Sequence, residues 1–251
     1  MTGSHFANGY RFLQMGQLTQ AITAFQEAIK EQPDLAEAHY NLANAYIGQR
    51  DYRQALAAYL EAVRLKPDFV QAHTNLGFVY ARLRQHEEAA AAFREAIRVK
   101  PNFVEAYLQL GNEYVAHEQF AQAILVLQDA LFHAPHNGEV WRALGYAHLR
   151  CAAYTEAVDA LEQAMRLLPE DPETHFHLGM ALYELGEHAS ARELFHCVTR
   201  LEPQNSGAYF NLALAHSALG SYAEAEAQCV KLQELDPALA GELRQELARR
   251  R

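Results

Sequence analysis

Side-chain amides recur along the sequence at a fixed spacing and could recognise a polypeptide backbone. Asn41, Asn75 and Gln109 follow one another at one constant interval, and Asn44 and Asn112 lie one helical turn further along. An amide carries both donors and an acceptor, so it can pair with the N–H and C=O groups of a peptide whatever the peptide's side chains are. The pattern indicates a repeated polar surface that can hold a peptide backbone.

Thirteen histidines raise the question of a metal site. His5, His39 and His73 repeat at the same constant interval as the amides. Neighbouring helices lie about 8–10 Å apart, whereas zinc–nitrogen bonds are about 2 Å long, so side chains one repeat apart do not easily share an ion. His175 and His177 are two residues apart and face different sides of a helix. We expect no metal site and no cofactor.

The sequence contains none of the motifs that carry common catalytic chemistry. There is no Gly-rich phosphate loop, no G-x-S-x-G and no H-E-x-x-H, because the segment that begins at His86 has Ala90 in place of the second histidine. Carboxylate pairs such as Glu87 and Glu88 are more simply explained as solvated helix surface. No nucleophile and base stand out as a pair, so we expect no enzymatic activity.

Composition and charge exclude several other classes of protein. Half of the residues are apolar and 21% are charged, which is typical of a soluble folded chain, and the net charge of −10 argues against nucleic-acid binding. Cys151, Cys197 and Cys229 form no C-x-x-C and indicate neither a disulfide framework nor a zinc site. Apolar runs are far shorter than the ~18 residues of a membrane span. Without a recognisable signal peptide we expect a cytoplasmic location, or a periplasmic one if a presequence had been removed.

A strict period positions all of these residues. Seven of the eight prolines are evenly spaced along the chain, at positions 33, 67, 101, 135, 169, 203 and 237. A fixed period of this length marks a repeat architecture. The predicted repeats are residues 2–35, 36–69, 70–103, 104–137, 138–171, 172–205 and 206–239.

Each repeat is predicted to form two antiparallel helices, which we name helix A and helix B. In repeat 36–69 apolar residues recur twice at helical spacing, the turn-prone residues 48–51 lie between the two runs, and Pro67 closes the unit. Aligned repeats place a small residue such as Gly77 on helix A and a large one such as Phe93 on helix B. This alternation favours close packing of the two helices.

The pattern resembles the tetratricopeptide repeat (TPR): an aromatic residue or Leu, Leu-Gly or Leu-Ala, Tyr, Ala, Phe or Tyr, Ala and Pro, in seven copies over residues 2–239. The resemblance implies an all-α, right-handed superhelical solenoid of antiparallel helix pairs, forming a single domain over residues 1–251. Its A helices would line a concave groove that binds an extended peptide or a partner helix. Residues 238–250, with Leu239, Leu243 and Leu247 on one face, look like a C-terminal capping helix.

Helix-A side chains that packing does not require are the candidate contacts in this groove. The predicted peptide-binding residues are Asn41, Asn44, Asn75, Phe78, Gln109, Asn112, Arg142, Tyr146, Phe176, His177, Met180, Phe210 and Asn211. The amides are similar to the asparagine ladder in the TPR region of O-GlcNAc transferase, although asparagine is also common there in TPR scaffolds. The apolar and aromatic residues either line the groove or pack against the neighbouring helix A. The cations with which one TPR subgroup holds the carboxylate of heat-shock chaperones are missing.

Three hypotheses for function follow. The first is a non-catalytic protein–protein interaction scaffold or adaptor that binds a peptide or partner segment of unknown identity in the helix-A groove. The second is a self-assembling structural protein, since the first helix is expected to be short and poorly formed and leaves Phe6, Phe12 and Leu13 at an uncapped end. The third is a recognition module of a larger enzyme, such as an O-GlcNAc-transferase-like glycosyltransferase.

Overall fold

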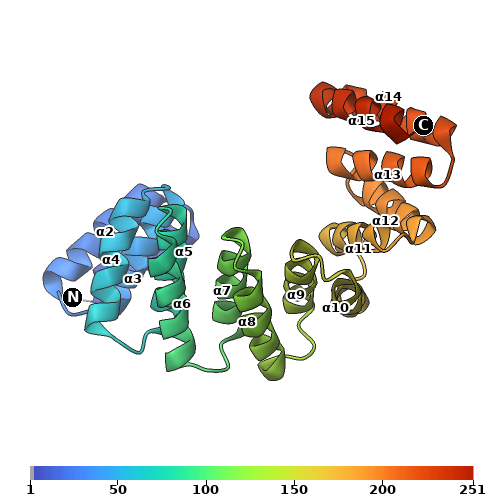
Figure 1. The fold of residues 1–251 in the computed structure, drawn as a ribbon. Coiled ribbons are helices and arrows are strands. Elements are labelled where there is room, and N and C mark those ends of the chain that lie inside the picture. The colour runs from blue at the N-terminus through green and yellow to red at the C-terminus, as the bar shows by residue number, and fades with distance from the viewer. Residues whose placement is uncertain (1–2, 251) are drawn as a thin grey trace. The chain divides into compact units, whose positions relative to one another are not determined.

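The structure, a computed structural model, describes residues 3–250, and every regular element in this range is an α-helix (Figure 1). The A helices are α1 (Gly3–Gln14), α3 (Ala36–Gly48), α5 (Val70–Arg82), α7 (Val104–Ala116), α9 (Gly138–Arg150), α11 (Pro172–Glu184) and α13 (Ser206–Ala218). The B helices are α2 (Leu18–Glu31), α4 (Tyr52–Leu65), α6 (His86–Val99), α8 (Phe120–His133), α10 (Tyr154–Leu167), α12 (His188–Leu201) and α14 (Tyr222–Leu235). A last helix, α15 (Pro237–Arg250), follows. The all-α helical-repeat fold is therefore confirmed.

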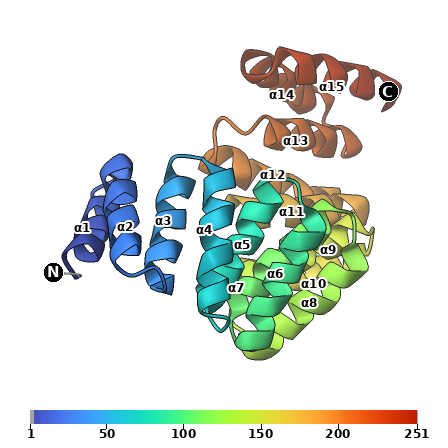
Figure 2. The same cartoon turned by 90° about the vertical axis from the view of Figure 1, so that its left-hand side faces the viewer.

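The chain divides into two compact units, whose described parts are residues 3–117 and 118–250. The boundary falls in the turn between α7 and α8, inside one predicted repeat. Within the first unit each helix packs on the next from α1 to α7, as Figure 2 shows for α1 to α4. Within the second unit α8 to α14 pack in the same order, and α15 packs on α13 and α14. That all the pairs form one continuous solenoid stays a prediction.

The A helices of each unit form a layer of their own. In the first unit α1 contacts α3 and α5 contacts α7, while the B helices α2 and α4 both pack on α3. In the second unit α11 contacts both α9 and α13. The A-helix side chains that this packing leaves accessible make up the surface on which binding was predicted.

Close approach of helix A to helix B depends on the small residues of helix A. A Cβ on Gly77 would stand 2.6 Å from Cε1 of Phe93, and one on Gly179 would stand 2.7 Å from Cε1 of Phe195. Both phenylalanines are buried. The close packing of helix A on helix B that the small–large alternation predicts is therefore present, because a side chain on either glycine would overlap the phenylalanine ring.

One residue in each turn from helix A to helix B has a left-handed backbone. These residues have φ between +58° and +82° and occupy the same position of successive repeats: Gly16, Arg50, Arg84, Glu118, Ala152, Gly186 and Gly220. After Arg50 the chain starts α4 with Asp51, whose carboxylate accepts a hydrogen bond of 3.1 Å from the backbone N–H of Gln54. The turn predicted at residues 48–51 therefore forms, although Gly48 is still the last residue of α3.

The recurrent histidines His39 and His73 form hydrogen bonds in the turns between repeats. A ring or hydroxyl near the start of helix A lies within hydrogen-bond distance of the carbonyl of the preceding proline, in the pairs His39–Pro33 (3.0 Å), His73–Pro67 (2.9 Å), Tyr107–Pro101 (2.9 Å) and Trp141–Pro135 (2.8 Å). Since tyrosine and tryptophan take over the same contact, it requires a hydrogen-bonding ring and no metal.

The first helix differs from what the sequence predicts. α1 spans 12 residues against 13 in α3, so the expectation of a short, poorly formed helix is wrong. Phe6 packs edge-to-face on Phe25 of α2 with ring centroids 5.8 Å apart, and Phe12 and Leu13 pack against the same core. These apolar contacts with α2 stabilise α1 despite its atypical sequence.

α15 covers the other end of the chain. Leu243 and Leu247 are buried against the core formed with α13 and α14, and Leu239 is partly buried there. Within residues 3–250, no helix is long and apolar enough to span a lipid bilayer. Among the cysteines, Cys151 is exposed and Cys229 is buried.

Candidate peptide-binding surface

Two of the predicted amides meet across neighbouring repeats of the first unit. Nδ2 of Asn75 donates to Oδ1 of Asn44 at 3.2 Å, to the hydroxyl of Tyr59 at 3.1 Å and to the hydroxyl of Tyr40 at 3.3 Å. The hydroxyl of Tyr59 in turn donates to Oδ1 of Asn44. Tyr59 is fully buried, and burial raises the pKa of its hydroxyl, which therefore remains a proton donor at neutral pH. This network fixes the orientation of both amides.

One amide donor and one amide acceptor of this asparagine pair are not used by the network. In the part of the chain that the structure describes, Nδ2 of Asn44 and Oδ1 of Asn75 take part in no hydrogen bond. Both side chains are half-buried on the A-helix layer. An N–H donor beside a C=O acceptor is the complement of the C=O and N–H groups of a peptide backbone.

The other predicted amides stand apart from this pair. Three of them donate one turn back within their own helix: Asn41 to the carbonyl of Glu37 at 2.7 Å, Gln109 to the carboxylate of Glu105 at 2.7 Å and Asn211 to the carbonyl of Gly207 at 2.9 Å. Asn112 is exposed. Phe78 is half-buried, with the guanidinium carbon of Arg82 4.9 Å from its ring centroid. The amides that look equivalent in sequence therefore differ in what they can offer a ligand.

In the second unit, His177 stacks on Tyr146 of the preceding repeat. Their ring centroids are 4.5 Å apart and the planes make an angle of 24°. Arg142, the predicted cation of the surface, forms ion pairs with Glu173 and, at 3.6 Å, with Asp171. The guanidinium is therefore already paired with carboxylates at the start of α11.

His177 is held neutral by its surroundings. Its pKa is lowered to about 4, because burial disfavours the imidazolium and the charge of Arg142 repels it, which outweighs the attraction of Asp171. Nδ1 of His177 is buried and has no hydrogen-bond partner among the described residues. Buried polar atoms normally have a partner, so this unsatisfied nitrogen is an exception among the packed rings of the A helices.

The predicted apolar residues of the second unit are partly occupied by packing. Phe176 packs edge-to-face on buried Phe195 with centroids 5.9 Å apart, and Met180 belongs to the same cluster. Both keep part of their surface exposed. Phe210 lines a pocket of about 390 Å³ between α13 and α15, together with Leu214, Glu242, Gln245, Glu246 and Arg249.

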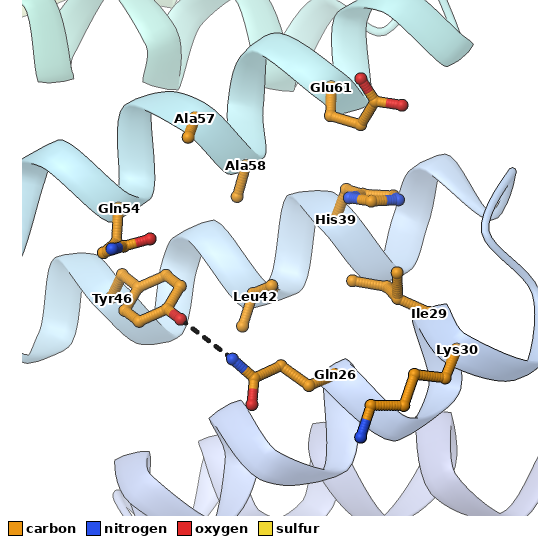
Figure 3. A pocket seen from close by; sticks show the side chains of 10 residues that line it. All are labelled: Gln26, Ile29, Lys30, His39, Leu42, Tyr46, Gln54, Ala57, Ala58 and Glu61. Carbon is orange, nitrogen blue, oxygen red and sulfur yellow. Dashed lines mark hydrogen bonds between the residues drawn. The ribbon is translucent and has the colours of Figure 1, made fainter.

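A pocket that the sequence does not indicate lies between α2, α3 and α4 (Figure 3). Its volume is about 580 Å³, and Gln26 donates from Nε2 to the hydroxyl of Tyr46 across it at 3.2 Å. The remaining lining residues are Ile29, Lys30, His39, Leu42, Gln54, Ala57, Ala58 and Glu61. Each of these residue types is common in helical repeats, so the sequence gives no sign that they line a pocket together.

Three family models match the chain. Residues 94–239 match the model described as the TPR domain of cytochrome c-type biogenesis protein H, which is more than half of the sequence. Residues 9–49 match a TPR repeat model and residues 40–102 a tetratricopeptide repeat model. A comparison with curated proteins found no match.

Several solved structures share the fold. PilF of Pseudomonas aeruginosa has a TM-score of 0.73 and 19% identity, over 84% of this chain and 97% of that one. YrrB, described as a TPR protein with an unusual peptide-binding site, has a TM-score of 0.62 and 23% identity, over 75% and 98% of the two chains. MamA of Desulfovibrio magneticus RS-1 has a TM-score of 0.61 and 24% identity, over 68% and 96%. Identities this low show the fold alone.

Proposed function

The chain belongs to the tetratricopeptide repeat family, by its match to the TPR domain of cytochrome c-type biogenesis protein H, and we propose that it is a non-catalytic scaffold that binds an extended peptide on its A helices. The fold is a protein-interaction module. The observation that carries the proposal is the pair Asn44 and Asn75, whose remaining donor and acceptor are held in place by Tyr59.

Orientation of the two amides before binding is what makes them suitable. Because Tyr59 and Tyr40 already restrain Asn75, a peptide does not have to order its side chain on binding, and less conformational entropy is lost. Each new hydrogen bond to a peptide backbone adds about 0.5–1.5 kcal/mol net. The half-buried rings of the A helices supply apolar contact area beside these polar groups.

Charge favours a basic partner for the second unit. Residues 118–251 contain 10 Lys and Arg against 19 Asp and Glu, a net charge of −9, whereas residues 1–117 contain 11 against 12, a net charge of −1. A field of one sign raises the rate at which oppositely charged segments arrive. We therefore expect the bound segments to carry more Lys and Arg than Asp and Glu.

Selection of peptides from a random library on the full chain tests the proposal. The dissociation constants of the selected peptides are measured by calorimetry for the wild type and for the variants Asn44→Ala and Asn75→Ala. We expect each variant to weaken binding roughly 3- to 10-fold, as loss of one or two hydrogen bonds implies. Asn102→Ala is the matched control, because Asn102 is exposed in the turn before α7. Equal affinities in wild type and both A-helix variants would refute the proposal.

The name of the matched family model suggests the first natural probes. Because that model describes a cytochrome c-type biogenesis protein, unfolded polypeptides of c-type cytochromes are to be titrated beside the selected peptides. We expect competition between a bound cytochrome polypeptide and a selected peptide if both use the A-helix surface. Binding of both polypeptides without competition would show that the cytochrome polypeptide uses another surface.

Self-association is the second candidate function. Tyr10 on α1 and Met15 after it are 49% and 61% exposed, and Phe12 lines a largely apolar pocket of about 350 Å³ nearby. Sedimentation of the wild type and of a Tyr10→Ser/Met15→Ser variant tests it. Wild-type dimers that the double substitution abolishes would support it, and a wild-type monomer at high concentration would exclude it. A third role, recognition within a larger enzyme, would use the same A-helix surface.

A further inference from the structure

Two histidines and a glutamate converge near the end of the first unit. His86 is the first residue of α6, Glu113 lies in the last turn of α7, and His117 follows that helix directly. Nδ1 of His86 is 2.6 Å and Nε2 of His117 is 3.5 Å from the same oxygen, Oε1 of Glu113. The two imidazole centroids are 3.6 Å apart. One ligand atom from each residue lies within 4.8 Å of the other two.

Local structure fixes this convergence. The backbone N–H of His117 donates to the carbonyl of Glu113 at 3.2 Å, so the two side chains lie one above the other on the same face of α7. α6 packs on α7 and brings His86 to that face. The side chain of Glu113 is only 12% exposed, whereas those of His86 and His117 are 35% and 36% exposed. A mostly buried carboxylate that contacts two imidazole rings is an arrangement that can bind a cation.

The repeat scaffold does not need these residue types. In five of the other six repeats the position of Glu113 holds a small apolar residue that is fully buried: Ala45, Val79, Ala147, Ala181 and Ala215. The triplet one repeat earlier is Tyr52, Val79 and Leu83, which packs as part of the apolar core. Glu113 is therefore the clear departure from the repeat pattern, and it occurs where His86 and His117 lie beside it.

We propose that His86, Glu113 and His117 form a binding site for a first-row divalent metal ion of the zinc class. Two imidazoles and one carboxylate are ligands that Zn²⁺ prefers, whereas Mg²⁺ and Ca²⁺ prefer oxygen ligands throughout. Three protein ligands leave the fourth position of a tetrahedral ion for water or for a side chain of a bound partner.

The distances require only small movements. Bonds of about 2.0–2.1 Å around a tetrahedral zinc ion place its ligand atoms about 3.3 Å apart. The 3.5 Å between His117 and Glu113 is already close to that value, and the 2.6 Å between His86 and Glu113 has to widen. His86 begins one helix and His117 follows another, so neither exposed ring is locked by packing on both sides.

The surrounding charges admit a cation. The N-terminus of α6 disfavours a positive charge and the C-terminus of α7 favours one, so the two helix dipoles oppose each other at the site. Glu87 and Glu88 follow His86 in the first turn of α6 and add negative charge beside it. Arg84, two residues before His86, carries the opposite charge, so the carboxylate of Glu113 is the negative charge in contact with both rings.

Titration of the full chain with Zn²⁺ by calorimetry and with Co²⁺ by absorption spectroscopy tests the proposal. The sample is prepared without a polyhistidine tag, and bound metal is first removed with a chelator. We expect the wild type to bind one Zn²⁺ at this site, to show the visible bands of low-coordinate Co²⁺, and to melt at a higher temperature with Zn²⁺ than without it. A wild type that shows no such binding event would overturn the proposal.

Three variants distinguish Zn²⁺ binding at this site from binding to other histidines of the chain. His86→Tyr/Glu113→Val/His117→Leu installs the apolar triplet of the preceding repeat, so it is expected to fold and to lose the binding event. Glu113→Gln should weaken Zn²⁺ by at least the roughly 10- to 100-fold that loss of an outer-sphere partner costs. His188→Tyr is the matched control, since His188 occupies the position of His86 and the repeat after it holds Ala215 and Leu219 in place of the other two ligands. Unchanged Zn²⁺ affinity in the triple variant would refute the site, as would loss of binding in His188→Tyr alone.

Discussion

Nδ2 of Asn75 lies 3.2 Å from Oδ1 of Asn44, and both amides bond to the hydroxyl of Tyr59 behind them. The hydroxyl both donates and accepts, so one atom links helix A of two repeats to the helix B between them. The ring that carries it is fully buried. Stability of the first unit and orientation of its candidate peptide contacts therefore depend on the same group.

Replacement of Tyr59 by Phe should affect both properties. The variant keeps the buried ring but leaves the two amides without their shared partner, so we expect a loss of about 1–2 kcal/mol in the free energy of unfolding. Binding of selected peptides should weaken as well. Denaturant midpoints provide the measurement. Tyr46→Phe is the control, because among residues 3–250 the hydroxyl of Tyr46 bonds only to Gln26, at a more exposed place. Equal losses in the two variants would contradict the expectation.

A methyl group on Gly77 should disturb the contact between α5 and α6. Its Cβ would stand 2.6 Å from Cε1 of buried Phe93, so we expect Gly77→Ala to lower the free energy of unfolding by about 1–3 kcal/mol through overpacking. Phe93→Leu in the same chain should recover part of the loss. Gly241 on α15 has open space around it, and Gly241→Ala should stabilise by up to about 1 kcal/mol from helix propensity. Similar destabilisation by both alanines would show that the close approach is unimportant.

Ala152 is expected to be a weak point of its turn. Its φ of +59° is uncommon for a residue with a side chain, whereas the equivalent Gly186 has φ +82° without steric conflict. We expect Ala152→Gly to raise the free energy of unfolding by roughly 0.5–1 kcal/mol and Gly186→Ala to lower it by a similar amount. Urea unfolding of the two single variants measures both changes in the free energy of unfolding. A lower free energy of unfolding in Ala152→Gly would contradict the assignment of backbone strain to Ala152.

Acidification should destabilise the second unit through His177. Its pKa is about 4 when folded and about 6.5 when unfolded, so between these values the unfolded chain binds the proton more strongly. The destabilisation therefore begins as the pH falls below about 6.5 and is complete below about 4, where it reaches on the order of 3 kcal/mol.

Asn replaces His at this position in other repeats, and His177→Asn provides the test. The difference in unfolding midpoint between pH 7 and pH 5 should be smaller in this variant than in the wild type. The pKa values of His148 and His216 are also lowered by burial, so part of the pH dependence remains. Asn211→Ala changes the equivalent position of the next repeat without removing a titratable group, and it should leave the difference as it is. If both variants behave alike, His177 is not the group responsible.

The sequence alone determined the repeating parts of the fold. Evenly spaced prolines end each helix B, glycine or alanine opposite a large residue sets the distance between A and B, and the turn residues recur at the same interval. These properties are local or depend on a partner at a constant separation along the chain. A reader of the sequence can therefore align the repeats and predict the helices without coordinates.

Expectations based on the absence of a pattern were less reliable. The first helix was expected to be short and poorly formed, yet Phe6 packs on Phe25 of α2 and α1 forms. Histidines at the same repeat position do not meet, but His86 and His117 belong to different positions of successive repeats and converge through Glu113. The contact of Phe6 with Phe25 recurs as Tyr40 with Tyr59 and as Phe176 with Phe195, so it follows the period. The convergence of His86 and His117 on Glu113 does not, and it could not be found by aligning the repeats.

Tertiary structure alone decided what each predicted contact residue can offer. Asn41, Asn75 and Gln109 look alike in sequence, but Asn41 and Gln109 bond within their own helices while Asn75 reaches across to Asn44. Arg142 looks like a free cation and is paired with Asp171 and Glu173. Periodicity specifies which face of a helix a residue occupies, whereas hydrogen bonding and charge depend on rotamers and on neighbours from other repeats, and those are fixed only when the helices pack.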